Sequence, residues 1–230
     1  MKNFWIFGDS FSAPWHIGED PFPDFQQYIE QEKLDGNSII QDLEYWLGVL
    51  SNKKFNFINT ARGGMSNDTI FDRAYKAYPK IKSGDYVLLQ LSQNTRVQTI
   101  QSSLTDWYDV FFSENNSREY IKEVNNVTLL GYENLEKIAL QRSTDLHLRK
   151  ILIQAQMFVS AVQKSNAKIC FTSLDRLGSE YSMIPGLYWD ISIFNPIEIK
   201  YPHIKDRHPT FEGHKNIAKK ILTSLEDNFL

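Results

Sequence analysis

Residues 4–12 read Phe4-Trp5-Ile6-Phe7-Gly8-Asp9-Ser10-Phe11-Ser12, and this stretch decides the fold that the sequence predicts. Four apolar residues stop at Gly-Asp-Ser, which is typical of a short buried strand that ends in a tight turn. Open α/β sheets bind their ligands at the carboxyl ends of their strands, so the hydroxyl of Ser10 is expected at such a position. Ser10 is therefore the candidate nucleophile, although Gly, Asp and Ser are also the commonest residues of ordinary turns.

The rest of the chain alternates between strand and helix patterns. Apolar runs predict further strands over residues 55–59, 85–91 and 169–174. Apolar residues at helical spacing predict helices over residues 39–50 with Ser38 as the N-cap, over about 68–78, over 144–165, and after Pro209. Such alternation indicates an α/β fold, with a parallel sheet covered by helices on both faces.

One long segment lacks a clear period. Residues 97–142 are mostly polar apart from an aromatic cluster at 107–112, and we interpret them as a partly helical insertion that caps the site. The 230 residues are otherwise expected to form a single domain, since a chain of this length fits one α/β domain.

Composition excludes several classes of function. A formal net charge of -3 offers no basic surface field, so nucleic acid is not an expected partner. No apolar run approaches the ~18 residues of a membrane-spanning helix, and the apolar run at residues 4–7 is too short for a signal peptide, which predicts a cytoplasmic location. The single cysteine, Cys170, excludes an internal disulfide and a cysteine-based zinc site, and no metal or cofactor is expected.

Three more polar clusters follow strands or precede the last helix. The glycine-rich turn at residues 60–68 would expose unpaired backbone N–H groups suited to an oxyanion, or would simply be a tight turn before a helix. Asn94 could donate a side-chain N–H to the same oxyanion, or could form an Asx turn. The stretch 206–214, Asp-Arg-His-Pro-Thr-Phe-Glu-Gly-His, supplies His208 as a general base for Ser10.

These clusters, in this order, resemble the sequence blocks of the SGNH hydrolases, also called the GDSL esterase family. The first block is matched by Phe7-Gly-Asp-Ser-Phe-Ser12, the second by residues 59–67, the third by Asn94 alone within Ser92-Gln-Asn-Thr95, and the last by His208-Pro209 with Gly213-His214. The resemblance implies a three-layer αβα sandwich with a mostly parallel, flavodoxin-like sheet. It covers these four blocks and the helices and strands between them, and it does not extend to residues 97–142 or 175–201.

The resemblance also implies roles for individual residues. Ser10 would be the acylated nucleophile and His208 its base, and an oxyanion hole would comprise the backbone N–H groups of Ser10 and Gly64 with the Asn94 amide. The family places an aspartate three residues before the histidine, where this chain has a lysine. Asp206 lies two residues before His208 and could still orient the imidazole, or a backbone carbonyl could do so and leave a catalytic dyad.

The sequence therefore favours a serine esterase that hydrolyses a carboxylic ester through an acyl-serine intermediate. An acetyl ester on a carbohydrate, or another small-molecule ester, is the expected substrate, because the aromatic loops suit the faces of sugars. Two alternatives stay open: an acyltransferase on the same scaffold, and a catalytically silent glycan-binding protein. The acyl and alcohol parts of the substrate and the oligomeric state are not determined by these patterns.

Overall fold

The computed structural model describes residues 1–14, 38–63, 65–92, 96–100, 107–111, 145–174 and 208–227. Four strands form one parallel sheet in the order β2-β1-β3-β6: β1 (Lys2–Phe7), β2 (Phe55–Asn59), β3 (Tyr86–Leu91) and β6 (Lys168–Ser173). The helices are α2 (Leu43–Leu50), α3 (Asn67–Ala77), α6 (Asp145–Lys164) and α7 (Phe211–Asp227), with the short 3-10 helix η1 (Tyr78–Lys80) after α3. The predicted α/β fold with helices on both faces is confirmed.

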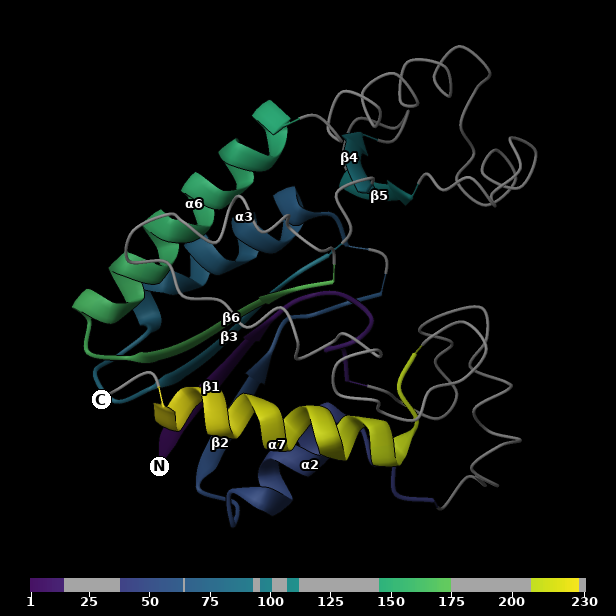
Figure 1. Cartoon of the computed structure of the whole chain (residues 1–230), viewed down its shortest axis with the longest axis vertical. Helices are drawn as coiled ribbons and strands as arrows, with labels where there is room; N and C mark the ends of the chain where they lie inside the picture. Colours follow the sequence, from purple (N-terminus) through teal and green to yellow (C-terminus); the bar gives the residue numbers. More distant parts are fainter. Residues whose placement is uncertain are drawn as a thin grey trace.

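The sheet lies between two helical layers, with α3 and α6 on one face and α2 and α7 on the other (Figure 1). Alternate residues of each strand point to opposite faces, so β1 contributes to both cores. Trp5 and Phe7 pack in the core under α3 and α6, whereas Phe4 and Ile6 pack in the core under α2 and α7. A strand buried on both faces reads as a continuous apolar run, which is why residues 4–7 are all apolar.

Among the described residues, the core under α3 and α6 is the larger of the two. Helix α6 alone contributes a continuous apolar stripe to it: Ile151, Leu152, Ala155, Phe158, Val159 and Val162. These side chains are all buried at helical spacing, and burying each of the larger ones contributes on the order of 2 kcal/mol to the folded state. Packing on both faces holds the strands of the sheet in place, and it thereby sets the position of the edge where the strands end.

The strand order places a topological switch point beside β1. After β1 the chain forms β2 on one side of β1 and then β3 on its other side. The segments that follow β1 and β3 therefore leave two neighbouring strands in different directions. A crevice at such a point, outside the carboxyl ends of the strands, is where open α/β sheets bind ligands. Ser10 follows β1 and Ser92 follows β3, so both belong to this edge.

Two predictions about local structure are wrong. Helix α2 begins at Leu43, and its N-cap is Asp42 rather than Ser38, because the Asp42 side chain accepts a hydrogen bond from the backbone N–H of Tyr45. Ile39, predicted to lie in the helix, precedes it and is 67% exposed.

The segment interpreted as a partly helical insertion contains strands where it is described. Strands β4 (Arg96–Ile100) and β5 (Trp107–Phe111) pair antiparallel in a sheet of their own. The aromatic cluster at 107–112 is thus largely a β-strand, in keeping with the strand preference of aromatic residues. Residues 112–144 lie outside the described residues.

Candidate active site

Ser10 lies in a tight turn directly after β1. The backbone N–H of Ser12 donates to the carbonyl oxygen of Asp9 at 3.0 Å, and the N–H of Phe11 donates to the Asp9 carboxylate at 3.1 Å. This turn needs Gly8 before it, since a Cβ atom there would lie 2.5 Å from Oε1 of Gln90. Ser10 itself is only 3% exposed, so its hydroxyl is held in a largely water-excluded position.

His208 lies against this hydroxyl although 198 residues separate the two along the chain. Its Nε2 atom is 2.8 Å from the Oγ atom of Ser10, which is hydrogen-bond distance. His208 is partly buried, and it lies three residues before Phe211, the first residue of α7. An imidazole nitrogen placed in this way can remove the hydroxyl proton, and the predicted pairing of the two residues is therefore seen in the geometry.

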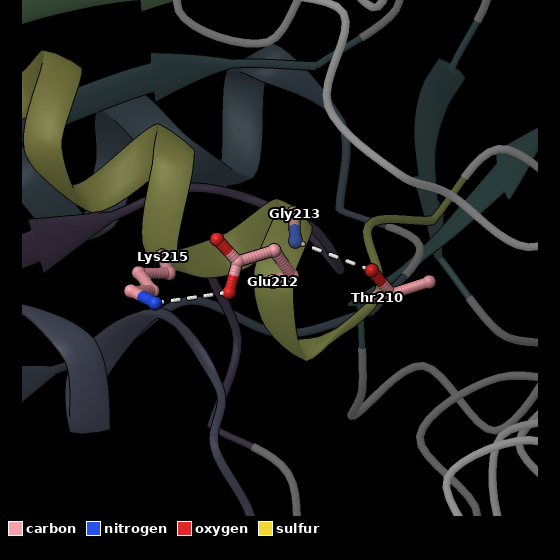
Figure 2. A network of polar contacts seen from close by, with 4 residues as sticks. All are labelled: Thr210, Glu212, Gly213 and Lys215. Carbon is pink, nitrogen blue, oxygen red and sulfur yellow. Dashed lines mark hydrogen bonds and ion pairs between the residues drawn. The ribbon is translucent and has the colours of Figure 1, made fainter.

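The start of α7 is secured immediately after His208. Thr210 accepts hydrogen bonds from two backbone groups of the first turn. Its Oγ1 accepts from the N–H of Gly213 at 3.2 Å (Figure 2). Its carbonyl oxygen accepts from the N–H of His214 at 2.8 Å. A threonine in this arrangement is a helix N-cap. Glu212 and Lys215 form an ion pair on the outside of the same turn at 3.1 Å. The cap fixes where the helix begins and so where His208 must lie.

An aromatic ring supports the imidazole. Phe11 stacks on His208 with ring centroids 4.7 Å apart and an interplanar angle of 28°. Since Phe11 directly follows Ser10, the turn that presents the hydroxyl also orients the base. The sequence offered no sign of this contact beyond the aromatic character of residue 11.

The carboxylate of Asp9 lies beneath the turn in a buried polar network. Its Oδ1 accepts from Nε2 of Gln90 at 2.8 Å, and its Oδ2 accepts from the hydroxyl of Ser92 at 2.8 Å. With the N–H of Phe11, three donors surround this fully buried group. Buried carboxylates require such donors, because burial of an unpaired charge is strongly unfavourable.

The loop after β2 is attached to the same turn. Nδ2 of Asn59 donates to the carbonyl oxygen of Ser12 at 2.9 Å, and its Oδ1 accepts from the N–H of Ala61 at 3.0 Å. The N–H of Arg62 donates to the carbonyl oxygen of Gly8 at 3.4 Å. The second block of the sequence therefore contacts the first through side-chain and backbone hydrogen bonds.

The remaining predicted site residues, Gly64, Asn94 and Asp206, lie outside the described residues. Their neighbours are nevertheless positioned: Asn67, the first residue of α3, accepts from the N–H of Ser92 at 2.8 Å and donates to its carbonyl oxygen at 3.2 Å. This pair of hydrogen bonds joins the segment after Gly64 to the segment before Asn94.

A second histidine is buried close to the base. His214, the fourth residue of α7, is fully buried. Burial lowers its pKa to about 3, and the charge of His208 shifts it in the same direction. His214 is therefore neutral at physiological pH.

The described residues also bear on metal binding and on membrane insertion. No group of three or more His, Cys, Asp or Glu side chains in these ranges is arranged to hold a metal ion. None of the helices there combines the length and the apolar character needed to cross a membrane.

The residues that hold the Ser10 turn in place were not predicted from the sequence. Gln90 is the single polar residue in the apolar run Val87-Leu-Leu-Gln-Leu91, and it is fully buried. A polar residue in an otherwise apolar strand is a signal that could have been followed, since buried amides need hydrogen-bond partners. Ser92 and Asn67 carried no comparable signal.

Comparisons with known proteins agree with the fold. Models of known protein families give no match, and neither do the curated proteins. Among solved structures, the Bacillus subtilis protein YXIM_BACsu is similar to the chain with a TM-score of 0.51 and 12% identity, over 99% of this chain and 56% of that one. The chain thus spans little more than half of that protein's length. A further match is the psychrotrophic esterase EstA from Pseudoalteromonas sp., in a structure inhibited by monoethylphosphonate, with a TM-score of 0.44, 11% identity, and coverage of 99% and 98%. At such identities the first match supports the α/β fold alone, and the second is too distant to add to it.

Proposed function

We propose that the chain is a serine esterase of the SGNH type, with Ser10 as nucleophile and His208 as general base. The observation that carries this proposal is the 2.8 Å separation of the Ser10 hydroxyl and Nε2 of His208 at the carboxyl end of β1. Nucleophile and base within hydrogen-bond reach, with the base oriented by a third group, is the arrangement that activates a serine.

The first half-reaction would acylate the serine. Nε2 of His208 takes the proton of the Ser10 hydroxyl as Oγ bonds to the ester carbonyl carbon, and the carbonyl oxygen becomes negatively charged. The backbone N–H groups of Ser10 and Gly64 and the amide of Asn94 would donate to this oxyanion. Each such donor is worth about 3 kcal/mol of barrier, so the hole contributes more than any single contact. The bond to the alkoxy oxygen then breaks, and His208 returns the proton to the leaving alcohol.

The second half-reaction would release the acid. His208 takes a proton from water as the water oxygen attacks the acyl-serine, and the oxyanion forms again. The bond to Oγ breaks, Ser10 regains its proton from His208, and the free acid leaves. Asp206 would accept a hydrogen bond from the second imidazole nitrogen and hold the tautomer that this cycle needs, while Phe11 supports one face of the ring.

We further propose that residues 1–230 form one domain and that the substrate is a small acyl ester, such as an acetyl ester on a carbohydrate. The aromatic residues in the stretches of sequence that follow Ser10 and precede His208 favour a sugar as the alcohol part. In an assay with added sugar acceptors, free acid as the product indicates hydrolysis, and acylated acceptor indicates transfer.

The proposal is tested by labelling with a fluorophosphonate probe and by hydrolysis of p-nitrophenyl acetate. The wild-type chain should be labelled once, at Ser10. Ser10→Ala should abolish labelling, and His208→Gln should lower hydrolysis by about 10³-fold or more, as loss of a catalytic base does in serine hydrolases.

Ser224→Ala is the matched control, because Ser224 is another buried serine, on α7, whose hydroxyl contacts the Sγ atom of Cys170. This variant should be labelled and should hydrolyse the ester as the wild type does. Equal activity of the wild type and Ser10→Ala would overturn the assignment of the nucleophile. Absence of labelling in a folded wild-type chain would overturn the esterase itself.

A further inference from the structure

We propose that Gln90 is the positioning residue of the nucleophile: its carboxamide holds the turn that carries Ser10 in the geometry needed for attack. This inference rests on the proposed role of Ser10 and adds a residue from a different strand to the machinery. Gln90 forms no hydrogen bond with Ser10 itself, and it would act through Asp9 and Ser12, which lie on either side of Ser10.

The carboxamide binds the turn on both sides of Ser10. Nε2 of Gln90 donates to Oδ1 of Asp9 at 2.8 Å. Oε1 accepts from the N–H of Asp9 at 3.2 Å and from the hydroxyl of Ser12 at 2.6 Å. One side-chain group therefore binds both Asp9, the residue immediately before Ser10, and Ser12, the second residue after it.

The carboxamide is itself held in place. Gln90 is fully buried near the end of β3, and its Nε2 also donates to the carbonyl oxygen of Leu91 at 3.3 Å. The strand end is fixed in turn by the two hydrogen bonds between the side chain of Asn67 and the backbone of Ser92. The turn is therefore held in place by contacts with the sheet and, through Asn67, with α3. Precise catalytic geometry requires side chains that are held rigidly in this way.

Only an amide meets these requirements. The group must donate to a carboxylate and, at the same time, accept from an N–H and a hydroxyl. Glutamine does both, an ionised glutamate can only accept, and methionine offers neither function at similar length. An ionised glutamate would also place a second negative charge against the buried carboxylate of Asp9, and the two like charges would repel each other.

The position of the turn matters for the reaction because the hydroxyl and the backbone N–H of Ser10 act on the same carbonyl group. A displacement of about 1 Å in a catalytic group can lower the rate by about 10²-fold. The turn lies close to the carboxamide of Gln90, since a Cβ atom added at Gly8 would be 2.5 Å from Oε1 of Gln90. A change in the carboxamide would move the turn rather than leave it in place.

The test uses Gln90→Glu and Gln90→Met, and it measures the rate of labelling by a fluorophosphonate per folded molecule between pH 5 and pH 8. Gln90→Met should be labelled about 10²-fold more slowly than the wild type. Gln90→Glu should be similarly slow at pH 8. Its rate relative to that of the wild type should rise as the pH falls, because a protonated glutamic acid again donates to Asp9. Taking the ratio removes any pH dependence that both proteins share.

Asp85→Asn is the matched control for the acid–amide exchange. Asp85 immediately precedes β3, at the opposite end from Gln90, and its change should alter stability but not labelling.

Labelling of both Gln90 variants within twofold of the wild type would overturn the inference. A loss in Gln90→Glu that does not change with pH would also overturn it, since general loosening of the fold predicts no pH trend. If Gln90→Met does not fold, Gln90→Glu alone decides. Failure of the wild type to be labelled is a different outcome, which removes the proposed function and the inference with it.

Discussion

Phe11 stacks on the imidazole of His208, with the two ring centroids 4.7 Å apart. One turn of chain therefore presents the hydroxyl through Ser10 and supports the base through the next residue. Stacking of this kind fixes the plane of the imidazole, and the face of an aromatic ring also favours the positive charge that the imidazole carries during reaction.

Phe11→Leu should therefore slow ester hydrolysis while preserving the fold. The aromatic contact is worth about 0.5–1.5 kcal/mol, which corresponds to a fall in rate of about two- to tenfold. The effect should appear in kcat with p-nitrophenyl acetate. Phe11→Tyr, which retains the ring, should keep the wild-type rate. Wild-type kcat in Phe11→Leu would show that the stacking does not orient the base.

Gly8→Ala should impair both stability and labelling of Ser10. The added methyl group would lie 2.5 Å from Oε1 of Gln90 and 3.1 Å from Cβ and Oγ of Ser12, so the buried carboxamide has to move. Such overpacking costs about 1–3 kcal/mol, which urea denaturation can measure.

Gly48→Ala is the matched control for that substitution. Gly48 lies within α2, and an added Cβ would meet its nearest neighbour, Cε2 of Phe57, at an ordinary 3.5 Å. Alanine favours a helix over glycine by about 1 kcal/mol, so this variant should be as stable as the wild type or more so. Equal stability of Gly8→Ala and Gly48→Ala would contradict the close packing of the turn on Gln90.

Asp85→Asn should destabilise the protein by about 1–3 kcal/mol at pH 7. The carboxylate accepts from the N–H groups of Asn3 and Lys82 and from the indole of Trp5, and an amide cannot accept all of these bonds. Burial alone would raise the pKa of Asp85, but these hydrogen bonds outweigh it, and the pKa lies below the ordinary value of 3.8. The difference in the free energy of unfolding between wild type and variant should therefore shrink as the pH falls below about 3.8.

Asp72→Asn provides the comparison for Asp85→Asn in urea denaturation. Asp72 pairs with Lys76 on the outside of α3, and both side chains are at least half exposed. Loss of such a surface pair changes stability by about 0.5 kcal/mol or less. A similarly small effect of Asp85→Asn would show that its buried hydrogen bonds contribute little.

His214 should also make the stability of the fold depend on pH. In Asp85 hydrogen bonds favour the charged form, whereas in His214 burial disfavours it. Burial, followed by the charge of His208, lowers its pKa to about 3 in the folded chain, whereas the unfolded chain has the ordinary value of 6.5. The unfolded state therefore binds a proton below pH 6.5 that the folded state does not. Stability should fall as the pH drops from about 6.5 towards about 3, by up to about 1.4 kcal/mol for each pH unit.

His214→Gln removes this titrating group and should flatten that part of the profile. The measurement is urea denaturation of both proteins at several pH values between 8 and 4, with the difference between them plotted against pH. Parallel profiles would show that His214 takes up its proton in the folded state.

Much of the framework was predictable because strands buried on both faces and helices with one apolar face have distinct periods. Residues 4–7 and 86–91 could hardly be other than central strands. Boundaries were less certain: Asp42 caps α2 in place of Ser38, since several polar residues near a helix start can accept the same hydrogen bond. Strands β4 and β5 were missed because a short antiparallel pair gives a weak pattern in a polar segment.

The sequence by itself determined the α/β class, the strand that ends at Ser10, and a histidine before the last helix as its candidate partner, since these follow from local pattern and motif order. Tertiary structure alone decided that Ser10 and His208 lie 2.8 Å apart, that Phe11 supports the imidazole, and that Gln90 holds the turn from the neighbouring strand. The physical reason is that hydrogen bonds and ring contacts between distant segments depend on strand order and register. Side chains 80 or more residues apart carry no local sign of each other until the sheet has formed.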